Sequence, residues 1–458
     1  MKTPQHQIAL LSFLILIIMF HTSTTTAATR GLYSLSSRSS SSNIKNHLFS
    51  RSLPNLNLQP RAAMITTAAA ITTTMDPRGR RIPAEWELHQ RIIMAWPTHW
   101  GPLNPKFQGD VARIAQAVSR FESVQMLVRP EHVEEAKASV GKGQTHEIEF
   151  LPIPVNDLWA RDFIPLFMTR PKDGAGGHGG EGKGERELVG VDYNFNGWGQ
   201  KAPYNLSTHA GERLIKHWNS TSSRRLVSRM VAEGGAIESD GQGTLLMTES
   251  SIVNDNRNPN KTRSDLEETF KEELGIKKVI WLKGLKGYDI TDSHIDALAR
   301  FVAPGVVMVS KPPPESQTQG LPLHSKWFQA WRDQYAQAIQ VLSTTTDAKG
   351  NSLRIIDLPE PNPSKTRRIP PEEVAVFEEI GVELCEKDGS GGINTYLNFL
   401  MVNGGIVMPE FGDEEADAEA KKIVEEQFPD REVETVRIDY LVKGGGGIHC
   451  STHDVPIV

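Results

Sequence analysis

Hydrophobic and polar positions along residues 83–458 repeat one order of elements, a helical segment followed by a short β-rich run. Apolar residues recur three or four positions apart in the helical segments and crowd together in the runs. Five such pairs stand out: Val111–Glu122 with Val124–Val128, His132–Val140 with His146–Ile153, Asp265–Leu274 with Lys277–Leu282, Trp327–Leu342 with Leu353–Leu358, and Ala416–Phe428 with Val433–Val442. This pattern predicts an α/β fold built from a divergent repeat in which helices cover strands.

The body of the chain, residues 83–458, is predicted to be one domain. No sustained shift in composition divides it. Three Pro- or Gly-rich stretches, Lys172–Arg186, Lys311–Leu323 and Pro359–Pro371, are predicted to be surface insertions rather than linkers.

The segment before the body has a different composition. Residues 1–75 hold six basic residues and no Asp or Glu, and Ile8–Phe20 is an apolar run too short to span a bilayer. We expect residues 1–28 to be a secretory signal peptide and residues 29–82 to be a low-complexity leader. Two alternatives stay open: an organelle transit segment, or translation from Met64 or Met75, which would leave the protein cytoplasmic.

Charge and cysteine content exclude several classes of protein. The chain has 50 basic and 56 acidic residues, so the part after residue 75 has 50 − 6 = 44 basic against 56 acidic residues, a net charge of −12. An acidic body argues against nucleic acid as a partner. With only Cys385 and Cys450 in the chain, a disulfide scaffold and a multi-cysteine metal site are excluded.

Reactive side chains follow the apolar runs, where loops commonly carry chemistry. The groups are Asp157, Arg161 and Asp162 in "NDLWARDF", Glu233 in "VAEGGAIE", Asp289, Asp292, His294 and Asp296 in "GYDITDSHID", and His449 and Cys450 in "KGGGGIHC". They supply one thiol, two imidazoles and several carboxylates, and we find no phosphate-binding loop beside them.

Cys450 is the strongest candidate for a nucleophile. Gly444–Gly447 removes side chains from the approach to it, and the neighbouring histidines would favour a thiolate. Two other interpretations stay open: a cysteine buried as a small hydrophobic residue, or a disulfide with Cys385.

His294 and Asp296 are two positions apart, so an extended strand would turn both to one side and Ile295 to the core. Such a pair suits general acid–base catalysis, although a structural histidine has the same signature. Glu233 has no basic neighbour in the sequence, which favours a cationic ligand, whereas Asp162 could simply pair with Arg161.

Several carboxylates around a thiol select a planar cation, because a guanidinium matches carboxylates bidentately and offers its central carbon to a thiolate. The sequence thus predicts hydrolysis of a substituted guanidine. Two alternatives remain: a metallohydrolase using His294, Asp296, His449 and His453, and a guanidine- or polyamine-binding protein without turnover.

The body also resembles a known family, the agmatine deiminases of the Porphyromonas-type peptidylarginine deiminase family, which are guanidino-group-modifying enzymes. The resemblance covers about residues 83–456. It rests on "PAEWELHQRIIMAWPTH", "NDLWARD", "VDYNFNGWGQK", "EGGAIESDGQGTLLMTESSIVNDNRNP", "VIWLKGLKGYDITDSHIDALARF", "YLNFLMVNGGIVMPEFGDEEAD", "FPDREV" and "GGGGIHCSTHDVP".

This resemblance implies a five-bladed, pseudo-symmetric α/β propeller of ββαβ units (the pentein fold), with catalysis by Cys450 as nucleophile and His294 as general acid and base. By the same resemblance, Asp162 and Asp296 hold the guanidinium and Glu233 orients His294 or the substrate. We expect Trp159, Trp198, Gly446 and Gly447 to contact the substrate. The implied reaction converts agmatine to N-carbamoylputrescine and ammonia without metal or cofactor, in a homodimer.

The sequence departs from the family pattern beside these motifs. Phe163 and Ile164 precede Pro165 where the family has Gly-Pro, Glu238 stands where it often has His, and residues 451–455 replace a Gln-rich run. The departures put the substrate tail in question. Other guanidine hydrolases, peptidylarginine-type deiminases and amidinotransferases therefore remain alternatives.

Overall fold

The computed structural model describes the chain except residues 1–75, 77, 173–184, 219–222, 320–323 and 381–393. The predicted signal peptide, nearly all of the leader, most of the Lys172–Arg186 insertion and Cys385 lie outside the described residues. Within the described part, no helix combines the length and the apolar character that a membrane span requires.

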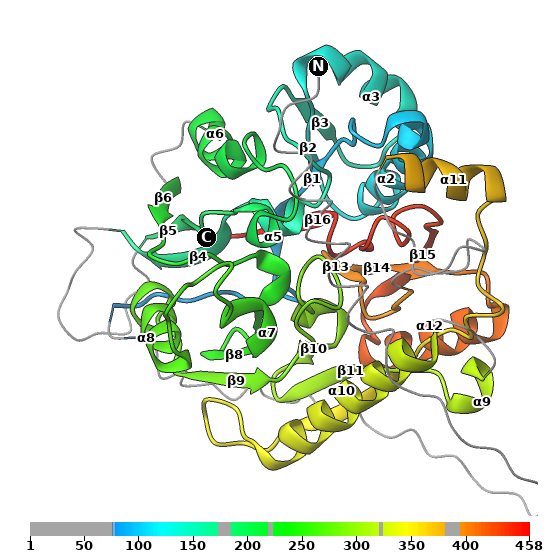
Figure 1. Cartoon of the computed structure of the whole chain (residues 1–458). Helices are drawn as coiled ribbons and strands as arrows, with labels where there is room; N and C mark the ends of the chain where they lie inside the picture. The colour runs from blue at the N-terminus through cyan, green and yellow to red at the C-terminus, as the bar shows by residue number, and fades with distance from the viewer. Residues whose placement is uncertain (1–75, 77, 173–184, 219–222, 320–323, 381–393) are drawn as a thin grey trace, which may run out of the picture. The chain divides into compact units, whose positions relative to one another are not determined.

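The strands of the described residues form five separate sheets (Figure 1). One has four strands in the order β16 (Thr452–Pro456), β1 (His89–Ala95), β2 (Val124–Leu127) and β3 (Ile148–Leu151). The others have three: β4 (Leu166–Pro171), β5 (Arg186–Asp192) and β6 (Ser223–Val227); β7 (Glu238–Ser239), β8 (Thr244–Thr248) and β9 (Lys278–Leu282); β10 (Ala299–Ala303), β11 (Val306–Lys311) and β12 (Arg354–Pro359); β13 (Leu400–Val402), β14 (Gly405–Glu410) and β15 (Glu432–Arg437).

Each sheet repeats the same pairing. Its first two strands are antiparallel and its second and third are parallel. The four-stranded sheet follows the rule only because β16, from the C-terminal end, pairs antiparallel with β1, with Met94 opposite Thr452. A parallel connection needs a crossover, and helices supply it. These helices are α2 (Asn104–Val118), α6 (Ala210–Trp218), α8 (Arg263–Leu274), α10 (His324–Thr344) and α12 (Glu414–Gln427).

All five predicted helix–strand pairs form, with their ends moved by a few residues. The largest differences are at α2, which begins at Asn104 rather than Val111, and at β15, which ends at Arg437 rather than Val442. The strand β15 ends early because the chain turns at Tyr440 and Leu441, whose amides donate to Asp110. The assignment of pairs to repeats needs correction. The pair α3 (Val133–Val140) and β3 extends the sheet of α2 and β2, while the unit containing α6 and β6 was missed.

Local sequence explains where these helices stop and which face they bury. In α8, the Thr262 side chain and the Asp265 carboxylate form a capping box, and Gly275 ends the helix in a left-handed conformation at φ 72°. Leu266, Phe270 and Leu274 recur at intervals of four and are all buried.

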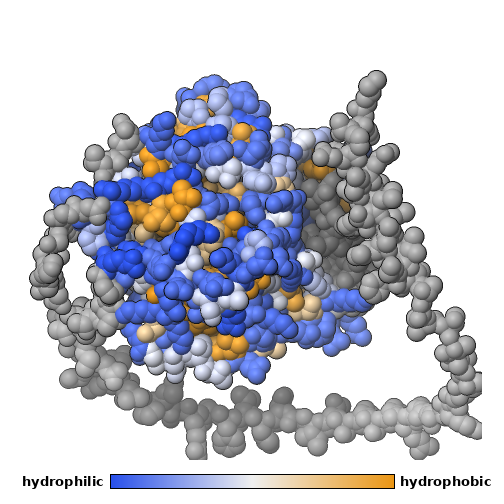
Figure 2. All heavy atoms as spheres, turned by 60° about the vertical axis from the view of Figure 1, so that its left-hand side comes forward, coloured by the Kyte–Doolittle hydropathy of each residue, from blue (hydrophilic) through white to orange (hydrophobic). Residues whose placement is uncertain are grey.

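The described surface carries few large apolar side chains. Figure 2 shows one face that is mostly hydrophilic, with hydrophobic residues in small separate patches. The exposed large apolar side chains in the described part are Leu88, Val227, Tyr288, Ile290, Ile457 and Val458. Scattered exposure of this kind is ordinary for a folded domain.

Candidate active site

The predicted site residues come from equivalent places in the fold, the short segments that lead into the first strand of each sheet. Asp162 lies in α4 (Ala160–Phe163) before β4, and Glu233 precedes η4 (Gly234–Ala236) and β7. His294 and Asp296 flank and enter η5 (Ile295–Ala297) before β10, and Cys450 lies just before β16. The fifth such segment, before β13, contributes Asn398. The repeat thus delivers one polar group or more from each sheet to one place.

His294 lies between two carboxylates. Its Nδ1 is 3.6 Å from Asp162 Oδ1, and its Nε2 is 3.3 Å from Glu233 Oε2. Asp162 is fixed in turn by the Gly235 amide at 3.0 Å and by the Trp198 indole N–H at 2.9 Å. All of these side chains are buried, so the contacts define one orientation of the imidazole.

Asp296 has one carboxylate oxygen fixed and one unused. Oδ2 lies 2.8 Å from Nδ1 of His449, whose Nε2 lies 2.7 Å from Glu85 Oε2. Both ring nitrogens of His449 therefore face carboxylate oxygens. Oδ1 of Asp296 is buried without a hydrogen-bond partner among the described residues. A buried, unpartnered carboxylate oxygen is suited to accept from a cationic ligand.

Cys450 is held beside Asp296 by Asn398. The Asn398 amide nitrogen lies 3.3 Å from Cys450 Sγ and 3.5 Å from Asp296 Oδ2, and its oxygen accepts from the Cys450 backbone N–H at 3.3 Å. The thiol itself lies 3.5 Å from Asp296 Oδ2. Cys450 is a free cysteine and is partly exposed, which separates it from the fully enclosed groups around it.

The glycines explain how these groups come so close. A Cβ built on Gly235 would lie 2.6 Å from His294 Nδ1, 2.9 Å from Asp162 Oδ1 and 3.1 Å from Asp296 Oδ2. Three predicted site residues therefore surround a single point. By contrast, a Cβ on Gly446 would meet Trp159 at 2.5 Å, and one on Gly447 would meet Asn398 at 2.6 Å.

The reason given for the glycine run therefore changes. At Gly446 and Gly447, the space that a side chain would fill is taken by protein side chains and not left open for a ligand. Gly445 alone in the run has φ +98° and no atom within 4 Å of a built Cβ. The run lets Trp159 and Asn398 pack against the backbone beside Cys450.

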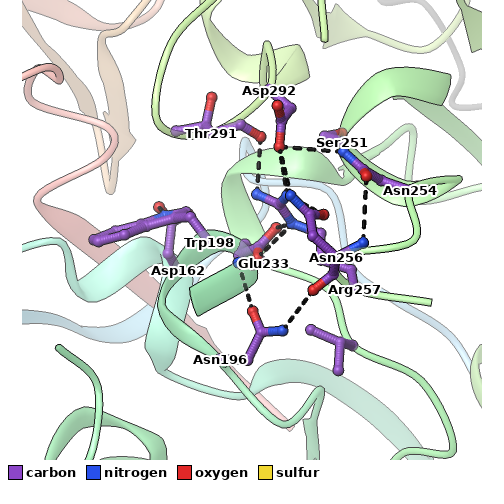
Figure 3. Close-up of polar contacts among 12 residues, drawn as sticks. Asp162, Asn196, Trp198, Glu233, Ser251, Asn254, Asn256, Arg257, Thr291 and Asp292 are labelled. Carbon is purple, nitrogen blue, oxygen red and sulfur yellow. Dashed lines mark hydrogen bonds and ion pairs between the residues drawn. The ribbon is translucent and has the colours of Figure 1, made fainter. Parts of the chain in front are cut away.

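Behind Glu233 lies a second polar layer (Figure 3). Nε of Arg257 lies 2.9 and 3.0 Å from the two Glu233 oxygens, and its Nη1 lies 2.7 Å from Asp292 Oδ2. The guanidinium also donates to the Thr291 carbonyl at 2.9 Å and to Asn256 Oδ1 at 3.0 Å.

Charge and burial set the protonation of the site. Burial raises the pKa of Asp162 to about 6, and the charges of Asp296 and Glu233 act in the same direction against that of His294. Burial would lower the pKa of His294, but the charges of Asp162 and Glu233 outweigh it and raise that pKa to about 9. His294 is therefore an imidazolium at neutral pH, and it can donate a proton.

The Cys450 thiol is protonated at neutral pH. Burial, and then the charges of Asp296 and Asp162, raise its pKa well above the ordinary value. The prediction that neighbouring histidines favour the thiolate is wrong in these surroundings. The His449 ring faces two carboxylates, and burial lowers the pKa of His453 to about 3, so that ring is neutral.

Three other expectations are corrected: the strand at His294 and Asp296, the unpaired Glu233 and, below, the pair of Arg161 with Asp162. His294 and Asp296 are not on an extended strand, because a bend with positive φ at Asp292 (62°) and Ser293 (71°) leads into η5; Ile295 is nevertheless buried as expected. Glu233 is paired with Arg257 rather than left for a ligand.

Arg161 does not pair with Asp162. Its guanidinium contacts Asp454 at 2.8 Å and Glu85 at 3.4 Å. The residues that depart from the family pattern near the site also contact other protein side chains. Glu238 is buried and pairs with Arg300 at 2.6 Å, and the ring of His453 packs edge-on against Phe167.

The arrangement favours a thiol site over a metal site. In the parts of the chain that the structure describes, no three His, Cys, Asp or Glu side chains are grouped to hold a metal ion. His449 already has both ring nitrogens against carboxylates, and His453 packs against Phe167. The proposed ligand set of the metallohydrolase hypothesis therefore does not assemble.

Sequence reasoning gave no role to Asn398, Glu85 and Arg257, although all three lie within the motifs quoted above. The position of Asn398 just before the first strand of a sheet was a usable signal, because the other site groups share it. Glu85 and Arg257 had no such signal, since each acts on a partner distant in the sequence.

Known proteins share this chain's sequence and fold. The family model described as Porphyromonas-type peptidyl-arginine deiminase matches residues 81–456. The agmatine deiminase of Pseudomonas aeruginosa (strain LESB58) is 32% identical over 399 residues, which is 84% of this chain and 98% of that protein. The agmatine deiminase of Medicago truncatula is 32% identical over 387 residues, 83% of this chain and 97% of its own length. The solved agmatine deiminase of Enterococcus faecalis is 27% identical with a TM-score of 0.65, covering 82% of this chain and 96% of that one.

Proposed function

We propose, since the chain belongs to the Porphyromonas-type peptidyl-arginine deiminase family, that it hydrolyses the guanidino group of agmatine. Agmatine and water give N-carbamoylputrescine and ammonia, a step towards putrescine. Relatives at 32% identity over most of both chains carry the name agmatine deiminase, which supports this substrate.

The first half of the reaction forms a covalent intermediate. The guanidinium enters between Asp162 and Asp296, and its positive charge offsets the charges that keep Cys450 protonated, so the thiol loses its proton to solvent. The thiolate attacks the central carbon and forms a C–S bond. A C–N bond then breaks, and His294 donates the proton with which ammonia leaves.

The second half returns the enzyme to its starting state. His294, now neutral, takes a proton from water, and the resulting hydroxide attacks the amidino carbon. The C–S bond breaks as the ureido product forms. The hydroxyl proton of the collapsing intermediate is released to solvent, and the sulfur takes a proton back from solvent, so Cys450 is a thiol again. His294 regains its proton in this step, so both halves use the same imidazole.

One observation carries the proposal. Around the point above Gly235, the imidazole of His294 and the carboxylates of Asp162 and Asp296 lie within 3.1 Å of a single position, and the thiol lies 3.5 Å from Asp296. A flat cation with carboxylates on its edge and sulfur near its carbon satisfies this geometry.

The test is turnover of agmatine by the purified protein, with ammonia and the ureido product both measured. Cys450→Ala is expected to lose all detectable product, because it removes the atom that forms the intermediate. Cys385→Ala, which removes the other thiol, is the matched control and is expected to keep wild-type activity. Intact-mass analysis of the wild type with agmatine should detect the amidino adduct, and Cys450→Ala should not form it.

Other outcomes would favour other reactions. Product without ureido groups that depends on an added amine would mean amidino transfer. Turnover of arginine peptides but not of agmatine would mean a peptidylarginine-type deiminase. Thermal stabilisation by agmatine without ammonia would indicate a binding protein, and an active Cys450→Ala variant would refute the thiol mechanism.

We further propose that the five sheets are blades of one pseudo-symmetric propeller around the site. The identical order of antiparallel and parallel pairs in all five, and the delivery of site groups from the segment before each first strand, support this arrangement. An experimental structure in which one repeated rotation does not relate the sheets would refute it.

Assembly and location are proposals from the sequence alone. We propose a homodimer, which sedimentation equilibrium would test, and entry into the secretory pathway through residues 1–28. A reporter fused to residues 1–82 tests the second point: it enters the endoplasmic reticulum if the leader is secretory, and remains cytoplasmic or enters an organelle under the alternatives.

A further inference from the structure

Arg257 joins the two loops that carry Glu233 and His294, although it touches no reacting group in the scheme above. It lies in the segment between α7 (Glu249–Ile252) and α8, with a side chain that is fully buried. Figure 3 shows its guanidinium between Glu233 on one side and Asp292 and Thr291 on the other. It therefore binds one catalytic loop through a side chain and the other through a side chain and a carbonyl.

We infer that Arg257 is a positioning residue of the deiminase reaction, which sets the charge of Glu233 and the path of the chain into His294. The inference rests on the proposed function. Arg257, which is not itself a reacting group, would have two effects, one electrostatic and one geometric. The two can be measured separately.

The electrostatic effect acts through Glu233. A fully buried carboxylate is costly unless a cation compensates it. Burial would raise the pKa of Glu233, but the charge of Arg257, followed by the contact with His294, lowers it. Without that charge Glu233 would take up a proton, and His294 would lose an anion that stabilises its imidazolium form.

The geometric effect acts through the bend before His294. Asp292 and Ser293 both have positive φ, a strained conformation for residues with a side chain. Contacts from several sides hold the bend. Arg257 and Lys201 both reach Asp292 Oδ2 at 2.7 Å, and the hydroxyls of Ser250 and Thr248 donate to the carbonyls of Asp292 and Ser293 at 2.6 Å.

The charged groups around the invoked residues are few. His294 is faced by Asp162, Glu233 and Asp296, and Glu233 by Arg257, His294 and Asp162. Asp292 is faced by Arg257 and Lys201. Removing the charge of Arg257 therefore leaves Glu233 with only His294 as a cationic neighbour among them.

The experiment compares Arg257→Met, which removes the charge, with Arg257→Lys, which keeps it without the planar fork. In substrate-free protein, NMR titration of His294, assigned with His294→Asn, should show its pKa falling by about one unit or more in Arg257→Met and returning most of the way in Arg257→Lys. In turnover, kcat should fall at least about tenfold in both variants, while KM changes less. The reason is that neither variant keeps all the contacts of the guanidinium to the two loops.

A double-mutant cycle tests whether Arg257 acts on His294 through Glu233. Glu233→Gln alone should lower the pKa of His294 as Arg257→Met does, and adding Arg257→Met to Glu233→Gln should lower it little further. Fully additive shifts would overturn the assigned route. Arg80→Met, which breaks the remote buried ion pair with Asp76, is the matched control and should leave the titration of His294 unchanged.

Failure of the inference and failure of the proposed function give different results. If the wild type turns over agmatine and Arg257→Met matches it in kcat and in the titration of His294, the role of Arg257 is refuted and the function stands. If the wild type has no deiminase activity, the proposed function fails, and the titration still decides whether Arg257 controls the charge of His294. If Arg257→Met does not fold, Arg257→Lys and the Glu233→Gln titration still test the two effects.

Discussion

At the scale of single residues, Gly235 allows three groups of the proposed reaction to come close together. Its amide donates to Asp162, and the space that a side chain would fill is taken by His294, Asp162 and Asp296. A methyl group there would lie within 3.1 Å of all three residues. These neighbours are themselves tied to Trp198, Glu233 and His449, so they have little freedom to move aside.

Gly235→Ala is therefore expected to reduce kcat/KM for agmatine by about 100-fold or more, because displacement of reacting groups by about an ångström has effects of this size. The measurement is steady-state kinetics beside thermal unfolding. Gly109→Ala in α2, where a Cβ would meet only Arg113 at 3.5 Å, is the control and should keep full activity with unchanged or higher stability. Normal turnover by Gly235→Ala would mean that the reaction does not depend on the close approach of these three side chains.

Residue identity alone pointed to many of these groups, but not to their partners. Cys450, His294, Asp162, Asp296 and Glu233 are chemically conspicuous in loops after apolar runs, and the structure brings them together. The chain of contacts from Glu85 through His449 to Asp296 joins residues hundreds of positions apart, so no local pattern contains it. Arg257 and Glu233 lie 24 positions apart, and their pairing reversed the expectation of a carboxylate without a cation.

At the scale of elements, Glu360 connects the sheet of β10–β12 to the segment before β13. Its carboxyl group accepts from the hydroxyls of Ser310 and Thr395 at 2.6 Å and from the Tyr396 amide at 2.8 Å. Burial nevertheless raises its pKa from 4.5 to about 7, since these donors offset the lost hydration only in part. The folded protein thus holds a proton on Glu360 more tightly than the unfolded chain does.

This difference predicts a pH-dependent cost. Stability should fall as pH rises from about 4.5 to about 7, because the unfolded chain releases the proton first, and the full cost should be present above that range. Glu360→Gln should remove it and be more stable than the wild type at pH 8 by on the order of 2–3 kcal/mol, with a much smaller difference at pH 5.

Urea unfolding of both proteins at the two pH values measures the effect. The exposed Glu414→Gln in α12 is the matched control and should show no such pH-dependent difference. An equal effect of Glu360→Gln at pH 5 and pH 8 would contradict the assigned titration.

Hydrophobic period was enough to find five helix–strand pairs, because a buried stripe and a buried run leave clear signals, but it missed α6 and β6. It failed where geometry depends on the backbone. The two-residue spacing of His294 and Asp296 suggested a strand, yet the positive φ of Asp292 and Ser293 turns the chain into η5. Neither residue is glycine, so no residue type marks this bend in the sequence.

At the scale of the whole body, β16 joins the end of the described chain to its first sheet. It pairs with β1 from Met94 to His89, and its own residues Thr452, His453 and Val455 are buried. Asp454 also binds Arg161, in the helix that carries Asp162. The position of Cys450 therefore depends on a strand that closes the sheet from the far end of the sequence.

Removal of residues 452–458 is expected to destabilise the body by on the order of 3–5 kcal/mol, through lost apolar burial and strand hydrogen bonds, and to reduce agmatine turnover at least about tenfold. Removal of Ile457 and Val458 alone, which are 51% and 43% exposed, should change both little. Circular dichroism melting and ammonia release measure the two effects. Wild-type melting of the longer truncation would show that β1 does not need β16.

The segment before each first strand supplies part of the pocket, so ammonia release also reports whether all five sheets are folded. If one sheet unfolded before the others as the denaturant concentration rises, turnover would be lost while most of the circular dichroism signal remained. Comparing the denaturant concentration at which turnover disappears with that at which circular dichroism is lost would therefore identify whether the five sheets melt together or whether one gives way first.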